Sequence, residues 1–194
     1  DEVRQYALAR LAMLPKAARA NAAALVAQRS GGNFLYAYHV LNDRLRPGID
    51  PDQVAWDQLP DRLESAYREF LQREIGVGTR WQQQFMPLLG TIAVGRGDGL
   101  TRAQLIGITG LAEDKAAPIL STCDQYLEHG GGDGGLYRIY HQSFRDFLLT
   151  DEQYGVFPAD RHAAIAQWLQ DQHGASWATC TDDYALRHTP GHWA

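Results

Sequence analysis

Apolar side chains recur every three or four residues in the first part of the chain, a spacing that places them on one face of an α-helix. The first such stripe covers residues 2–14, and Pro15 ends it because proline lacks the amide hydrogen that would continue the helix. Two more helices are predicted over residues 16–29 and 33–45, with a pair of glycines between them. We therefore predict a helical domain over residues 1–52.

The middle of the chain combines helical stripes with one β-favouring segment. An amphipathic stripe covers residues 59–71, and Pro60 suits its first helical turn. Two further helix starts carry the pattern of a capping box, a threonine followed three residues later by a glutamine: Thr79 with Gln82, and Thr101 with Gln104. A helix over residues 113–128 is then followed by a glycine-rich turn and by a predicted strand over residues 136–140.

This order of elements predicts a winged-helix domain over residues 53–152. A wing is a β-hairpin and needs two strands, yet the segment before Gly130 has a helical pattern. Either the wing is small, or its second strand comes from elsewhere in the chain. Helices predicted at residues 161–172 and 183–188 would begin a second helical domain over residues 153–194. The predicted fold class is mainly α with a small β element.

The composition and the net charge exclude several classes of protein. Hydrophobic residues make up 45% of the chain and charged residues 21%, which excludes a disordered tail. The net charge of -5 argues against nucleic acid or an anionic membrane as the main partner. No apolar run reaches the roughly 20 residues that span a bilayer, and the first residues lack the basic-then-apolar pattern of a secretory signal. Two cysteines far apart in the sequence indicate no disulfide framework, so we expect a cytoplasmic location.

Both ends of the sequence lie within helical patterns. The chain starts inside the first stripe and stops just after the last one. We therefore expect it to be a piece of a longer polypeptide.

Three local patterns partly resemble a phosphate-binding loop, a zinc site and a hydrolytic triad. The glycine run at residues 130–135 follows a predicted helix and has no lysine after it, so we interpret it as a wing and not as a phosphate-binding loop. Cys180, His188 and His192 offer only three candidate zinc ligands with no established spacing, so no metal site is predicted. His141, Ser143 and Asp146 lie too close in sequence to form a hydrolytic triad, and Ser143 is expected to cap a helix. The sequence predicts no catalytic residue.

A winged helix can also bind DNA through the helix before the wing. Here that helix, residues 113–128, carries four acidic side chains against the single Lys115. Phosphate binding needs the opposite charge, so DNA binding is not favoured.

Four segments together resemble a known family. They are GGNFLYA at residues 31–37, a stretch from LPDRL to YREFL at 59–71, YHQSFRDFL at 140–148 and DYALRH at 183–188. In this order they are similar to the lid and winged-helix domain of STAND-class signalling NTPases, the NACHT and NB-ARC group. The third segment resembles the "MHD" motif that closes the winged-helix domain in that family. The fourth resembles the start of the helical region that leads into repeats.

The resemblance implies that the catalytic residues and the residues of this chain belong to different domains of one protein. The phosphate-binding loop and the Walker B acid would lie before Asp1, so this chain would not be an enzyme, whereas its parent would be an ATPase using ADP or ATP with Mg. In the family, the histidine of the MHD-like motif contacts the β-phosphate of ADP, and that role maps onto His141. Gly32, Asn33 and Phe34 would lie near the nucleotide. The expected partners are the NTPase domain and downstream repeats of the same polypeptide, with homo-oligomers on activation and no nucleic acid or membrane partner.

Other interpretations of the same residues stay open. His141 could be a structural histidine that joins a strand to a helix. Asn33 could be a helix cap, and Phe34 a core aromatic on an inner face shared with Tyr38, Leu41 and Leu45. As a whole, the chain could be a winged-helix DNA-binding regulator or a plain helical protein-interaction module.

Overall fold

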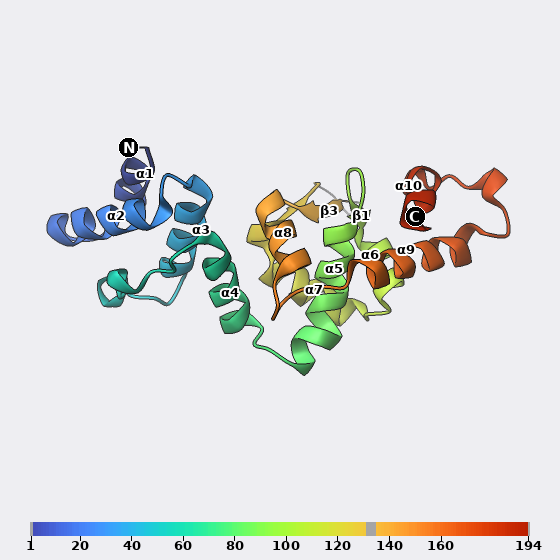
Figure 1. Cartoon of the computed structure of the whole chain (residues 1–194), viewed down its shortest axis with the longest axis horizontal. Helices are drawn as coiled ribbons and strands as arrows, with labels where there is room; N and C mark the ends of the chain where they lie inside the picture. The colour runs from blue at the N-terminus through green and yellow to red at the C-terminus, as the bar shows by residue number, and fades with distance from the viewer. Residues whose placement is uncertain (1, 131–134, 194) are drawn as a thin grey trace. The chain divides into compact units, whose positions relative to one another are not determined.

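The computed structural model describes residues 2–130 and 135–193, which are mainly helical with one small sheet, as the sequence predicted (Figure 1). Contacts divide the chain into two compact units, Asp1–Arg73 and Glu74–Ala194. The domain boundaries predicted at residues 52 and 152 stay a prediction, because compact units defined by contacts need not be domains that fold independently. In the described part of the chain, no helix has both the length and the apolar character needed to cross a membrane.

Three helices open the first unit: α1 (Glu2–Arg10), α2 (Lys16–Ser30) and α3 (Phe34–Arg44). The first ends earlier than predicted, and residues 11–13 form a turn before Pro15. Alanine is common where these helices meet, which lets their backbones approach closely. The fully buried side chains include Ala7, Leu11, Ala22, Ala23, Val26, Ala37 and Leu41. Each large one contributes about 1.5–3 kcal/mol to the stability of the unit.

The predicted inner face of α3 is right at Leu41, which is buried, and wrong at Phe34. Phe34 is 48% exposed, while Tyr36 and Val40 are buried. The Tyr36 hydroxyl donates a hydrogen bond to the Pro60 carbonyl, and burial raises the pKa of this phenol to about 12. The buried acceptor for its hydroxyl allows Tyr36 to occupy the inner face of α3.

Two short 3-10 helices, Pro51–Gln53 and Trp56–Gln58, lead to α4 (Leu63–Glu74). This helix buries the predicted stripe, which includes Leu63, Ala66, Tyr67, Phe70 and Leu71. The start of the helix was predicted too early. Pro60 lies before α4, where its carbonyl accepts the Tyr36 hydroxyl instead of opening a helical turn.

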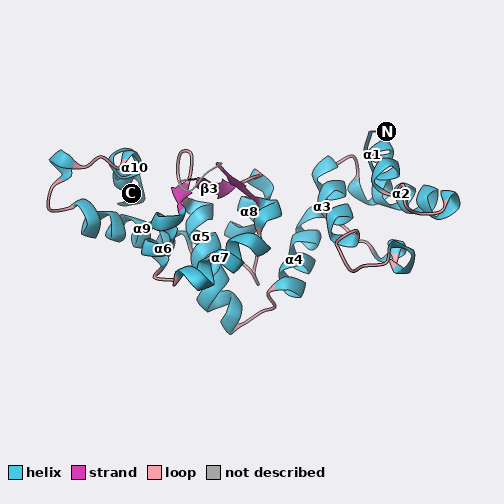
Figure 2. Cartoon of the chain, turned by 180° about the vertical axis from the view of Figure 1, so that it is seen from behind, coloured by secondary structure: helices cyan, strands magenta, loops and turns pink. Residues whose placement is uncertain are grey.

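The second unit has the order of elements that was predicted for a winged helix. A π-helical turn, Trp81–Phe85, leads into α5 (Met86–Val94), and then come β1 (Leu100–Thr101), α6 (Arg102–Thr109) and α7 (Glu113–Thr122). The capping box of Thr101 and Gln104 at the start of α6 is present as predicted. The strands β2 (Leu127–His129) and β3 (Leu136–Ile139) complete an antiparallel sheet in the order β1-β3-β2. Figure 2 shows the strands together near one end of α5.

The prediction of a helix over residues 113–128 was wrong at its end. The helix stops at Thr122, a 3-10 turn follows, and Leu127 pairs with Ile139 in the wing. The wing is small, with β2 and β3 as its two strands, and a strand from elsewhere in the chain, β1, also pairs with β3. Both expected alternatives are therefore partly right. Pairing with β3 overrides the helical spacing of the apolar residues in this stretch.

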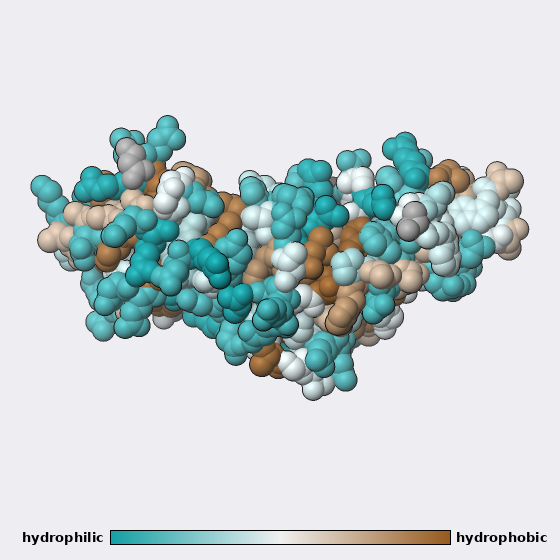
Figure 3. Space-filling model, viewed as in Figure 1, coloured by the Kyte–Doolittle hydropathy of each residue, from teal (hydrophilic) through white to brown (hydrophobic). Residues whose placement is uncertain are grey.

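Three further helices pack against or follow the winged helix: α8 (Gln142–Thr150), α9 (Pro158–His173) and α10 (Asp183–Trp193). The last is longer than predicted and contains Pro190. Glycines let α9 lie close to the winged helix. A Cβ atom at Gly90 of α5 would come within 3.2 Å of Arg161 Cδ in α9, and one at Gly107 of α6 within 2.5 Å of Trp168 Nε1. Hydrophilic residues cover most of the face in Figure 3.

Candidate functional site

His141 lies at the junction where the wing returns to helix. The backbone N–H of Tyr140 donates to the Tyr126 carbonyl at 2.9 Å, which extends the wing pairing beyond β3. His141 keeps an extended backbone, with φ -129° and ψ 135°, and α8 begins at the next residue. It is therefore the N-cap of α8.

The cap is made by the imidazole ring. His141 Nδ1 accepts the backbone N–H of Ser143 at 3.2 Å and lies 2.9 Å from Ser143 Oγ. Ser143 was expected to cap the helix, and that expectation was wrong, because the residue two positions earlier has the extended backbone that a cap requires. His141 therefore has the structural role that was considered for it, because its ring caps the helix that follows the wing.

This cap also fixes where the ring proton lies. A nitrogen that accepts an amide hydrogen carries no hydrogen itself, so the proton of the neutral ring is on Nε2. His141 is exposed, and within the described residues no hydrogen bond involves its Nε2 atom. The ring therefore presents an N–H donor outward from the start of α8, where the helix dipole favours an anion.

The junction is held firmly on both sides. Phe144, on the first turn of α8, is buried and stacks on Tyr126 with ring centroids 4.4 Å apart. Arg145 Nε donates to the Ala93 carbonyl at 2.6 Å, which ties α8 to the end of α5. These contacts position the ring of His141 relative to the winged helix before any ligand binds.

The other three predicted residues lie at one helix start in the first unit. Gly31 and Gly32 have φ values of 54° and 87°, so the turn uses the left-handed conformation that glycine adopts without strain. The Asn33 side chain accepts the Tyr36 N–H at 3.2 Å and caps α3, as the residues alone predicted. Phe34 is half exposed, and its ring centroid lies 4.6 Å from that of Tyr6. The interpretation of Phe34 as a core aromatic is wrong.

No family model, no curated protein and no solved structure matches this chain. Any function must therefore be argued from its own residues and contacts.

Two of the residues considered as zinc ligands or as members of a hydrolytic triad form hydrogen bonds to other side chains. Both ring nitrogens of His192 are hydrogen-bonded, to His162 and to Tyr184. Asp146 Oδ1 accepts from Gln142 Nε2 at 2.6 Å and so takes part in a contact within α8. These contacts occupy the ring nitrogens of His192 and one carboxylate oxygen of Asp146.

The helix before the wing has the wrong charge for DNA. In a winged helix, α7 would be the recognition helix, and its first turn exposes Glu113 and Asp114. Two cations nearby are already paired, Arg102 with Glu113 and Lys115 with Asp114. On the wing, Arg138 is paired with Glu128 at 2.8 Å. Phosphates would have to displace these carboxylates, so the geometry does not favour a DNA interface.

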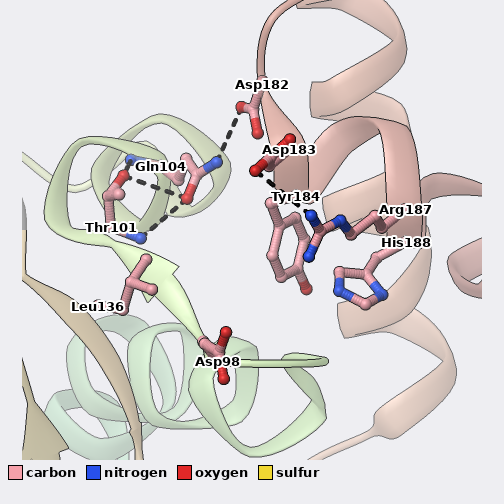
Figure 4. A pocket seen from close by; sticks show the side chains of 10 residues that line it. Asp98, Thr101, Gln104, Leu136, Asp182, Asp183, Tyr184, Arg187 and His188 are labelled. Carbon is pink, nitrogen blue, oxygen red and sulfur yellow. Dashed lines mark hydrogen bonds and ion pairs between the residues drawn. The ribbon is translucent and has the colours of Figure 1, made fainter.

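The sequence patterns gave no hint of one further cavity. A pocket of about 290 Å³ lies between the start of α10 and the β1–α6 corner of the winged helix (Figure 4). Its lining includes Asp98, Gln104, Asp182, Tyr184 and His188. Gln104 Nε2 donates to Asp182 Oδ2 at 2.9 Å across one wall. The capping box of α6 thus also holds the start of α10.

Proposed function

We propose that this chain is the lid and winged-helix part of a STAND-type NTPase and helps to hold that protein in a closed, ADP-bound state. The first unit would supply the helical lid. The winged helix would carry His141 to the phosphates. On this proposal the chain has no catalytic site, and the phosphate-binding loop belongs to a preceding domain of the same polypeptide.

The observation that carries the proposal is the geometry of His141. Its Nδ1 atom is occupied by the Ser143 amide, which directs the remaining ring proton to Nε2. An exposed Nε2–H at the start of a helix suits a phosphate oxygen, because both the donor and the helix dipole favour negative charge. The order of the winged-helix elements, with the motif directly after β3, supports the same assignment.

In the closed state, bound ADP would supply the phosphate oxygens that accept this hydrogen bond. His141 would orient its donor through the Ser143 cap, and Phe144 and Arg145 would hold the junction in place. A hydrogen bond to a charged group contributes about 1.5–3 kcal/mol. Loss of the contact would therefore weaken ADP retention by roughly 10- to 100-fold. Exchange for ATP would shift the population away from the closed form.

The cap and the phosphate contact can be separated by substitution. Asparagine is a good N-cap, so His141→Asn keeps an acceptor for the Ser143 amide but removes the ring Nε2–H. The test is the ADP dissociation rate of the longer polypeptide that contains this chain. We expect His141→Asn to release ADP at least tenfold faster, with a melting temperature within a few degrees of the wild type.

A matched control lies on the wing. His129 is an exposed histidine whose Nε2 atom is 2.9 Å from Asp124 Oδ1. His129→Asn should leave ADP release unchanged. If His141→Asn also leaves it unchanged while the fold is intact, His141 is only a helix cap and the proposed role is wrong.

A further inference from the structure

Three polar side chains form a hydrogen-bonded chain between α9 and α10. His162 Nδ1 lies 2.7 Å from His192 Nδ1, and His192 Nε2 lies 2.8 Å from the Tyr184 hydroxyl. His192 is only 4% exposed. We call these three residues, His162, Tyr184 and His192, the histidine lock.

The lock is tied to the loop that connects α5 to β1. The Arg96 backbone N–H donates to the Tyr184 hydroxyl at 3.1 Å, and the Arg96 guanidinium donates to the Gly191 carbonyl at 2.6 Å. The packing leaves little room here, since a Cβ atom at Gly97 would come within 2.6 Å of His188 Nε2. The lock therefore joins α10 both to α9 and to the winged helix.

The hydrogen bonds specify where each proton lies. The Tyr184 oxygen accepts from Arg96, so its own hydrogen is free to be donated to His192 Nε2. His192 then carries its proton on Nδ1 and donates it to His162 Nδ1. In this arrangement each of the two contacts within the lock joins one donor to one acceptor, and both histidines are neutral.

Charged groups around the lock oppose a further proton. Burial, with smaller contributions from His162, Arg96 and His188, lowers the pKa of His192 to about 4. Burial also lowers the pKa of His162, with contributions from Arg96 and from Arg145 of α8. Burial raises the pKa of Tyr184, Arg96 opposes this effect, and the carboxylate of Asp182 adds a smaller effect in the same direction as burial. A proton on His192 would also occupy the nitrogen that accepts from Tyr184.

We propose that the histidine lock is a proton-sensitive device that holds α10 against α9 and the winged helix at neutral pH and releases α10 on acidification. This inference does not depend on the proposed nucleotide function. Release would open the wall of the pocket in Figure 4 that Tyr184 and His188 provide.

The pH window follows from the two states of His192. When α10 is released, the ring regains its ordinary pKa of 6.5, whereas the docked ring has a pKa of about 4. The released state binds the proton more readily, so docking is fully favourable above pH 6.5 and weakens as the pH falls towards 4. Within this window the docking equilibrium falls by up to about tenfold per pH unit, and the lowered pKa of His162 acts in the same direction.

The test is amide hydrogen exchange of α10 in the full chain, followed by mass spectrometry between about pH 7.5 and pH 4.5 and corrected for the intrinsic exchange rate. Peptides from the buried helix α5 serve as the internal reference. We expect protection of α10 to fall at least tenfold between pH 6.5 and pH 5, while protection of α5 changes much less. Protection of α10 that stays constant, or that falls only together with that of α5, overturns the proposal.

Substitution of His192 tests whether the pH dependence of α10 protection comes from the histidine lock. His192→Gln keeps hydrogen-bonding groups in place but removes the titration of this ring, so the dependence of α10 protection on pH should be much weaker, with only His162 still contributing. His129→Gln on the wing should retain the wild-type response. If His192→Gln keeps the wild-type response, the proposal is wrong. If instead it releases α10 at neutral pH, the ring titration of His192 by NMR decides: a value near 4 supports the lock, and the ordinary 6.5 overturns it.

Discussion

Trp168 of α9 lies directly over Gly107 of α6, so that a Cβ atom at position 107 would come within 2.5 Å of the indole Nε1 and 2.6 Å of Cε2. The contact fixes how closely α9 approaches the winged helix, because only a residue without a side chain fits beneath the ring. The absence of a side chain at position 107 is therefore part of the packing between these two helices.

We expect Gly107→Ala to destabilise the chain by about 1–2 kcal/mol, although alanine at an open helical site would stabilise it by up to about 1 kcal/mol. Urea unfolding measures the difference. Trp168→Ala provides the control, since in that background Gly107→Ala should become stabilising. A stabilising effect of Gly107→Ala in the wild-type background would show that the indole does not restrict this position.

The cap of α3 offers a test within the first unit. Asn33 accepts the Tyr36 N–H, and its loss leaves that amide without a partner at the helix start. Asn33→Ala should lower the free energy of unfolding by about 1 kcal/mol, whereas Asn33→Asp should keep most of it. Thermal unfolding followed by circular dichroism compares the two variants. Equal losses in both would contradict the capping role.

The two cysteines should differ in reactivity. Burial raises the pKa of the Cys123 thiol to about 12, with Glu74 acting in the same direction, so the reactive thiolate is scarce at neutral pH. Cys180 is only partly buried. Iodoacetamide at about pH 8 should modify Cys180 in the folded chain and Cys123 only after unfolding. Peptide mapping identifies the labelled site, and rapid labelling of Cys123 without unfolding would show that this part of the core opens.

Local signals predicted the elements that rest on local contacts. The capping box of Thr101 and Gln104 uses residues three apart, so the start of α6 was predicted correctly. The amphipathic stripe of α4 likewise predicted which residues would be buried. The sequence also placed a β element after the glycine run, because Leu136 and the residues that follow it favour a strand.

Features that depend on distant partners were missed. The strand β2 has only three residues, and its pairing with β3 decides its conformation against a helical pattern. Phe34 was expected inside because its spacing fits, but the inner face holds Tyr36, whose hydroxyl has a buried acceptor. At the candidate site, histidine is not a usual cap, so the ring contact of His141 with Ser143 gave no sequence signal. His162 and His192 lie 30 positions apart with no linking pattern.

The sequence of the gene on the 5′ side of the codon for Asp1 tests the central claim most directly. If this chain is the lid and winged helix of a STAND-type NTPase, a Gly-x-x-x-x-Gly-Lys-Ser/Thr motif should lie roughly 150–250 residues before Asp1, about the length of one domain. An open reading frame that covers that distance without such a motif would contradict the proposed function.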